Sequence, residues 1–234
     1  MLIWGSIENT LEAEKIKGKW GRLMARIYLI RHGETDGNKF KSIQGCMDLP
    51  LNAKGIEQAE KMANYFKDIP LDAIYCSSMN RACRTAEELG KVKGLEIHPM
   101  DELREITFGE WEGVPFPELE RRWPEGFKTY FANPMQWTPP GGETLPHVQE
   151  RTFGAVKAIL EKEGSDKNIA IVCHGGVIRV LLCTLLGMDL DNIWRLSVAN
   201  VSVSSFNEWN GKFISDTIND YHFLNEKKEF SPVL

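Results

Sequence analysis

Two short apolar runs that end alike constrain the fold of this chain more than any other feature. Residues 27–30 (IYLI) and 169–173 (IAIVC) contain no charged side chain. Such runs are typical of strands that are buried on both faces of a sheet. A histidine followed by a glycine comes within two residues of each run, as His32-Gly33 and His174-Gly175. The sequence therefore predicts two buried strands whose carboxyl ends carry the same pair of residues.

Helical and extended patterns alternate along most of the chain. Further strands are predicted at 73–76 and 95–98, and Asn210-Gly211 between two extended runs predicts a β-hairpin. Alternation of strands with helices is typical of an α/β fold. We therefore predict a three-layer sandwich with a mostly parallel central sheet and helices on both faces. Apolar side chains at helical spacing predict helices over 52–66, 80–91, 144–162 and 177–187.

Composition bears on location and on partners. The chain has 28 basic and 33 acidic residues, a net charge of −5, so a broadly basic surface for nucleic acid is not expected. Its apolar runs are much shorter than the roughly 20 residues that a membrane-spanning helix needs. Five cysteines without a C-x-x-C spacing fit reduced thiols, and the first residues lack the pattern of a signal peptide. We expect a cytoplasmic protein with no nucleic-acid or membrane partner.

The length of 234 residues favours one domain with additions. Residues 1–24 precede the first strand, and we treat them as an N-terminal extension that need not belong to the fold. Two interpretations stay open, because Met24 fits a natural start and residues 9–23 fit a short amphipathic helix. Residues 25–234 are predicted to form a single domain. Within it, residues of about 107–145 are rich in proline and aromatic side chains, and we expect them to form a lid insertion.

Polar residues at the strand ends indicate a binding site. Ligands of such folds bind outside the carboxyl ends of the strands, where His32 and His174 are expected to lie. The glycine after each histidine lets backbone N–H groups approach a ligand closely. Arg81 follows the strand at 73–76, and a planar guanidinium suits the oxygens of a phosphate. The pattern predicts a cationic pocket for a phosphate group.

Six motifs in this order resemble the histidine phosphatase superfamily, in its phosphoglycerate-mutase-like branch. The resemblance extends from about Arg26 to Leu224, and its order makes it far more specific than the R-H-G-E-T string alone. The motifs are Arg31-His32-Gly33-Glu34-Thr35 with Asn38, Gln44-Gly45 with Asp48, Ser77-Ser78 with Arg81, Leu103-Arg104-Glu105 with Trp111-Glu112-Gly113, Pro140-Gly141-Gly142-Glu143, and His174-Gly175-Gly176.

The resemblance implies a role for each residue of the candidate site. His32 would be the nucleophile that forms a phosphohistidine, and Glu105 would protonate the leaving oxygen and then activate water. His174 would be the third catalytic residue and would stabilise the phosphoryl oxygens. The resemblance implies neither a metal nor another cofactor. The substrate-binding residues that it implies are Arg31, Asn38, Gln44, Gly45, Arg81 and Gly175.

The same chemistry serves phosphatases and mutases, and several substrates stay open. Hydrolysis is favoured over a phosphoglycerate mutase, because mutases of the family usually carry longer insertions around the pocket than the segment from Met24 to Leu234 has room for. The lid and the end of the chain look similar to α-ribazole-5′-phosphate phosphatases of cobalamin nucleotide-loop assembly, and this small phosphomonoester is the first expectation. A metal-independent phosphoserine phosphatase or a broad-specificity phosphatase is the alternative. Most aromatic side chains of the lid are expected to pack it onto the body, and one or two could contact a ring. Members of the family often form dimers, which leaves room for a homodimer.

Other classes of function stay open. A metal-dependent hydrolase could use His32, His174, Glu105 and Asp48 as ligands, although no H-x-x-x-H pair supports it. An inactive binding module is the other alternative, and the full set of polar residues argues against it. At the mouth of the pocket, His147 and Cys46 are weaker candidates.

Overall fold

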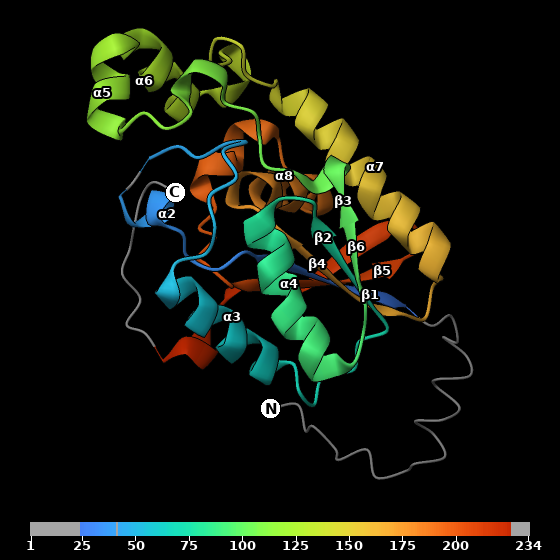
Figure 1. Cartoon of the computed structure of the whole chain (residues 1–234). Helices are drawn as coiled ribbons and strands as arrows, with labels where there is room; N and C mark the ends of the chain where they lie inside the picture. Colours follow the sequence, from blue (N-terminus) through green and yellow to red (C-terminus); the bar gives the residue numbers. More distant parts are fainter. Residues whose placement is uncertain (1–23, 41, 226–234) are drawn as a thin grey trace, which may run out of the picture.

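The computed structural model describes residues 24–40 and 42–225, so the questions about residues 1–23 lie outside the described part of the chain. Its centre is a six-stranded sheet in the order β3-β2-β4-β1-β5-β6, shown in Figure 1. The first four strands along the chain pair in parallel, and the last two pair antiparallel. The strands are β1 (Ala25–Arg31), β2 (Ala73–Ser77), β3 (Ile97–Met100), β4 (Asn168–Cys173), β5 (Val203–Trp209) and β6 (Lys212–Asp220).

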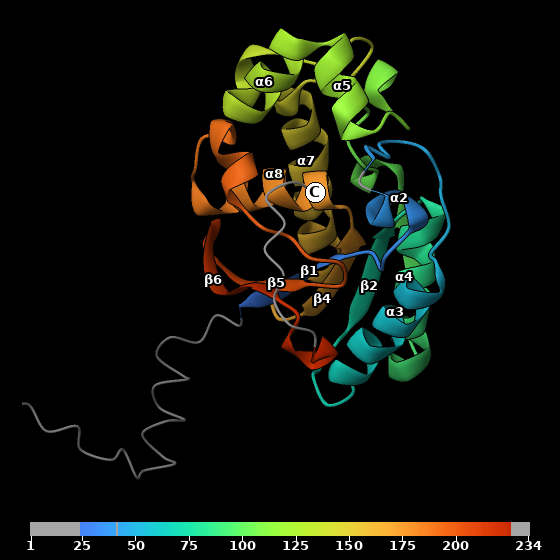
Figure 2. The same cartoon turned by 90° about the vertical axis from the view of Figure 1, so that its left-hand side faces the viewer.

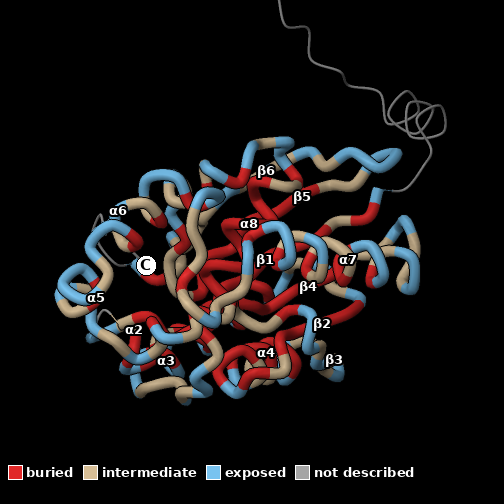
Figure 3. The backbone as a smooth tube through the Cα atoms, turned by 90° about the horizontal axis from the view of Figure 1, so that it is seen from above, coloured by how far each residue is buried: buried red, intermediate tan, exposed pale blue. Residues whose placement is uncertain are grey.

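Helices cover both faces of the sheet and complete the three-layer sandwich (Figure 1, Figure 2). Successive side chains of a strand point to opposite faces, so each buried strand contributes to two cores. Ile27 and Leu29 of β1 pack with α7 (Leu145–Glu163) and α8 (Gly175–Leu186). Tyr28 and Ile30 pack with α3 (Ala53–Tyr65) and α4 (Asn80–Lys93). Figure 3 shows β1 and β4 buried between these layers, and the predicted fold class is confirmed.

The third strand and helix α8 each begin two residues away from the sequence-based prediction. The third strand begins at Ile97 rather than 95, because the chain turns at Gly94 with φ 65° and Leu95 N donates to Gly90 O at 3.1 Å. Helix α8 begins at Gly175 rather than 177, with His174 as its N-cap. Only His174 separates the end of β4 from the start of α8, so the N-terminus of the helix lies at the end of the strand.

Residues 107–145, the predicted lid, contain two helices that the sequence patterns do not reveal. They are α5 (Phe116–Arg122) and α6 (Pro124–Ala132), drawn in green at the top of Figure 1. Each is too short to establish a helical period, and Pro124 separates them. Trp111 is fully buried beneath them, with its ring centroid 4.9–6.4 Å from the rings of four other lid residues. These rings belong to Trp123, Phe127, Tyr130 and Trp137.

One further short helix, α2 (Asp36–Lys39), follows β1. Thr35 is its N-cap and forms a capping box with Asn38, which fixes the chain directly after the first histidine motif. Across the described ranges 24–40 and 42–225, no helix combines the length and the apolar character needed to span a bilayer.

Candidate active site

The sheet brings the two histidine motifs together. Strands β1 and β4 are parallel neighbours in which Arg31 is opposite Cys173, so the next residue of each strand leaves the sheet at the same edge. His32 N donates to Cys173 O at 3.0 Å. The rings of His32 and His174 lie with their centroids 5.2 Å apart, and both residues are buried. The two residues that the sequence placed at strand ends therefore meet.

His32 is held in one orientation. Its Nδ1 lies 2.7 Å from Gly33 O, and because a carbonyl can only accept, the ring donates its N–H there. The lone pair is then left on Nε2. Burial and the charges of Arg81 and Arg31 hold the pKa of His32 well below its ordinary value. A neutral imidazole with a fixed tautomer is what a nucleophilic nitrogen requires.

His174 lies next to His32 but is not among the residues that line the pocket. It is fully buried, and its Nε2 shares a hydrogen bond of 2.7 Å with the hydroxyl of Ser77, at the end of β2. Its Nδ1 has no hydrogen-bond partner among the described residues. Burial and the charge of Arg81 lower the pKa of His174, so this ring is also neutral at pH 7. The sequence patterns gave Ser77 no role of its own.

Two buried arginines make the pocket cationic. Arg31 donates from Nη1 to Val198 O at 2.7 Å, and burial lowers its pKa to about 10, so it stays charged. Arg81 donates to Met47 O at 2.7 Å and to Gly45 O at 2.9 Å. The Nε of each guanidinium is buried without a partner in the part of the chain that the structure describes. Both side chains therefore have donors available to an anion.

The loop after β1 brings Asn38 and Gln44 to the pocket. The Thr35 hydroxyl lies 2.8 Å from Gln44 Oε1, and Asn200 Nδ2 donates to His32 O at 3.0 Å and to Asn38 Oδ1 at 3.3 Å. Gly45 has φ 51°, and a Cβ added there would meet Glu112 Oε1 at 2.2 Å. Glycine is therefore required at this turn.

Glu105 is bound to the N-terminus of α8 rather than exposed in a solvated charge run. Its carboxylate accepts from Gly176 N at 3.1 Å and from Val177 N at 3.2 Å. Ile106 N also donates to it, at 3.0 Å. Free N–H groups at a helix start hold a carboxylate in place. Glu105 is thereby fixed opposite the histidines across the turn of α8.

One pocket gathers nearly all the residues that the sequence singled out. Every predicted site residue lines it except His174, and Phe108 and Ile43 supply its apolar side chains. Of the weaker candidates, Cys46 packs beside it, with Sγ 3.1 Å from Thr107 Oγ1, and His147 pairs with Glu143 instead. The lining residues are Arg31, His32, Asn38, Ser42, Ile43, Gln44, Gly45, Arg81, Glu105, Phe108 and Gly175.

Arg179 is a charged residue near the site that the sequence patterns missed. It is buried on α8, donates to Leu196 O at 2.9 Å and lies over the Trp194 ring at 5.3 Å. Burial lowers its pKa to about 10. A Cβ added to Gly175 would lie 3.2 Å from Arg31 Nε and 3.3 Å from Arg179 Nη1. The position of Arg179 one helical turn after Gly175 was the available signal.

The proposed metal ligands do not form a group. Asp48 is exposed and accepts from Asn80 N at 2.8 Å. Within residues 24–40 and 42–225, no three or more His, Cys, Asp or Glu side chains are arranged to hold a metal ion.

Known proteins are similar to this chain over the part that contains these residues. A profile of the histidine phosphatase superfamily (branch 1) matches residues 27–221. Phosphoserine phosphatase 1 of Hydrogenobacter thermophilus is 32% identical over 181 residues, which cover 77% of this chain and 85% of that protein. Adenosylcobalamin/alpha-ribazole phosphatase of Escherichia coli is 30% identical over 173 residues, 74% and 85% of the two chains. The structure of YhfR from Bacillus stearothermophilus matches with a TM-score of 0.81 at 31% identity, covering 86% of this chain and 99% of that one.

Proposed function

Because this chain belongs to the histidine phosphatase superfamily, branch 1, we propose that it hydrolyses small phosphomonoesters through a phosphohistidine at His32. The observation that carries the proposal is the hydrogen bond of 2.7 Å between His32 Nδ1 and Gly33 O. It leaves Nε2 with the lone pair that attacks phosphorus. Two charged arginines beside it supply donors for the phosphoryl oxygens.

The first half of the reaction transfers the phosphoryl group to the enzyme. The bond between phosphorus and His32 Nε2 forms while the bond from phosphorus to the leaving oxygen breaks. Protonated Glu105 gives its proton to that oxygen, so the alcohol leaves neutral. Arg31 and Arg81 stabilise the phosphoryl charge throughout. His174, whose buried Nδ1 has no partner among the described residues, is the third group that we propose to stabilise the phosphoryl oxygens.

The second half of the reaction returns the enzyme to its starting state. Water attacks phosphorus, the bond to Nε2 breaks, and the proton of the water passes to Glu105. Inorganic phosphate leaves, and His32 regains its lone pair. The side chains named here perform each step, so we propose that the reaction needs no metal ion.

The leaving group is where the substrate must be identified. Phe108 and Ile43 give the pocket a small apolar wall, which favours α-ribazole 5′-phosphate as the first substrate to test. The relative at 32% identity that is named phosphoserine phosphatase makes L-phosphoserine the second. We propose a small phosphomonoester rather than a nucleic acid, consistent with the net charge of −5. A preference below about tenfold between the two esters, about 1.4 kcal/mol, would indicate a broad-specificity phosphatase.

Trapping of the intermediate tests the mechanism. The enzyme is mixed with each ester, quenched at alkaline pH and digested, and phosphohistidine is sought by mass spectrometry. We expect the phosphate on the peptide that contains His32. Both the phosphopeptide and the hydrolytic activity should be absent in His32→Ala. His222→Ala removes an exposed histidine and should behave as the parent protein. Parent-like hydrolysis by His32→Ala would refute the proposal.

Removal of metal ions separates this mechanism from the metal-dependent alternative. After dialysis against EDTA, the protein should keep its full kcat/KM. A loss that added divalent metal restores would favour the metal-dependent hydrolase instead.

A further inference from the structure

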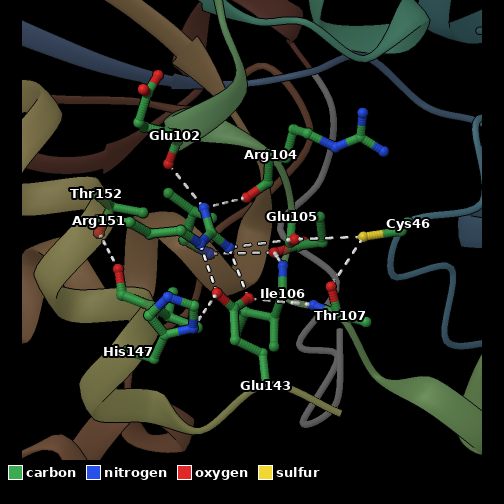
Figure 4. A network of polar contacts seen from close by, with 12 residues as sticks. Cys46, Glu102, Arg104, Glu105, Ile106, Thr107, Glu143, His147, Arg151 and Thr152 are labelled. Carbon is green, nitrogen blue, oxygen red and sulfur yellow. Dashed lines mark hydrogen bonds and ion pairs between the residues drawn. The ribbon is translucent and has the colours of Figure 1, made fainter. Parts of the chain in front are cut away.

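The guanidinium of Arg151, on α7, lies under the chain segment that carries Glu105 (Figure 4). It is separated from that segment by more than forty residues in sequence, and the family motifs do not include it. We propose that Arg151 and Glu143 form a clamp that positions Glu105, an inference that rests on the proposed function. Arg151 is a positioning residue here, because it reaches the reaction through Glu105.

The contacts of Arg151 use its whole donor set. Nε and Nη2 bind the two oxygens of Glu143 at 2.7 and 2.8 Å, a bidentate pair. Nη1 donates to the carbonyls of Glu102 and Arg104 at 2.7 and 2.8 Å. Nη2 also donates to Glu105 O at 3.3 Å. Five N–H groups thus meet five acceptors, three of them on the backbone at or just before Glu105.

Glu143 ties the clamp to the other side of the same segment. Its backbone N donates to Thr107 O at 2.8 Å, and Thr107 N lies 3.4 Å from Glu143 Oε2. Burial alone would raise the pKa of the Glu143 carboxyl, but the hydrogen bond and charge of Arg151 lower it below its ordinary value. Glu143 is therefore ionised at neutral pH, as a charged clamp requires. Its side chain and that of Arg151 are 10% and 16% exposed, so solvent screens the pair only partly.

The segment that carries Glu105 belongs to no helix or strand. The short 3-10 helix η1 (Asp101–Leu103) ends just before Arg104, and the carbonyls that follow are satisfied by Arg151. On the opposite side, the carboxylate of Glu105 reaches the first N–H groups of α8. The backbone of Glu105 is thus fixed by α7 and its side chain by α8. A displacement of about 1 Å in such a group can cost about 100-fold in rate.

The test uses the dependence on the leaving group, which a purely structural role would not change. The enzyme variants are Arg151→Lys, which keeps the charge but not the five-donor fork, and Glu105→Gln as the reference for a lost acid. The substrates are p-nitrophenyl phosphate, whose phenolate leaves without a proton, and an alkyl ester that the parent hydrolyses, L-phosphoserine or α-ribazole 5′-phosphate. The value of kcat/KM is measured for both, because it reports the first phosphoryl transfer.

We expect Arg151→Lys to lower kcat/KM for the alkyl ester by about 10- to 100-fold and for p-nitrophenyl phosphate by less than about threefold. Glu105→Gln should give the same pattern with a larger loss. Arg121→Lys is the matched control, because Arg121 forms the same two-bond fork with Glu118, at 2.8 and 2.7 Å, on the exposed surface of α5. That control should leave both values within about twofold of the parent.

The possible outcomes separate the two hypotheses. An equal loss on both esters in Arg151→Lys, with Glu105→Gln selective for the alkyl ester, overturns the clamp and leaves the proposed function standing. An equal loss on both esters in Glu105→Gln overturns the acid assignment and the clamp with it. Should Arg151→Lys not fold, as judged by its melting temperature, Glu143→Gln weakens the same fork and must give the same selective loss.

Discussion

At Gly33, one added methyl group should lower the catalytic rate while the protein still folds. A Cβ built there would lie 2.4 Å from Gly55 O and 3.0–3.1 Å from two further backbone atoms of Gly55. Backbone cannot rotate out of the way as a side chain can. In Gly33→Ala the loop and the start of α3 must therefore separate by at least about 0.6 Å to reach a tolerable 3.0 Å contact.

The displaced atoms include the one that orients His32, the proposed nucleophile. Gly33 O accepts the N–H of His32 Nδ1, so a shift of this size moves the ring directly. We expect kcat/KM to fall by tenfold or more, since about 1 Å of misplacement costs about 100-fold. The overpacked contact should cost about 1–3 kcal/mol of unfolding free energy. Urea denaturation and steady-state kinetics with p-nitrophenyl phosphate measure the two effects.

The control for this variant is Gly154→Ala. Gly154 lies inside α7, and an added Cβ there meets no atom within 4 Å. We expect parent activity and a gain of about 0.5–1 kcal/mol, because alanine favours a helix over glycine. A folded Gly33→Ala protein with kcat/KM within threefold of the parent would refute the view that contact with Gly55 sets the orientation of His32.

Two further predictions concern the buried histidines and the lid. Burial and neighbouring arginines lower the pKa of His32 and His174 in the folded state, so the unfolded chain binds more protons below its own histidine pKa of about 6.5. The urea midpoint should therefore fall as the pH drops from 7 to 5, and less steeply in His174→Gln; an equal slope in both proteins would contradict this. Trp111→Ala should cost about 3–5 kcal/mol, because the fully buried ring packs four lid residues. Thermal unfolding with kcat/KM would check it, and a loss below about 1 kcal/mol would show that the lid does not depend on this ring.

The parts of the site that the sequence predicts are those set by local pattern and sheet topology. His32 and His174 follow apolar runs in which each side chain faces one of two cores, so their meeting follows from the parallel pairing of β1 and β4. The same reasoning does not show that His174 stays outside the pocket lining, because depth depends on packing from Ser77 and the other layers. Arg151 could not be found this way, because three of its five acceptors are backbone carbonyls, which leave no trace in the sequence.

The helices of the lid were hidden for a different reason. Helix α5 has seven residues and α6 has nine, so Phe127, Tyr130 and Phe131 do not extend over enough turns to establish a helical period. The bounds of β3 were missed because Leu95 resembles a strand residue, while its N–H closes the turn at the end of α4.

The paired backbone at Thr107 and Glu143 has a consequence for how such a chain can diversify. The chain enters and leaves residues 108–142 at two points joined by a hydrogen bond of 2.8 Å. His32, Arg81, Glu105 and His174 all lie outside that excursion, while Phe108, its first residue, lines the pocket. A segment whose ends already meet can be lengthened, shortened or exchanged at small cost in closure entropy. A different segment can therefore be exchanged between Thr107 and Glu143, which would alter the pocket at Phe108 without changing the residues that we propose act on the phosphate ester.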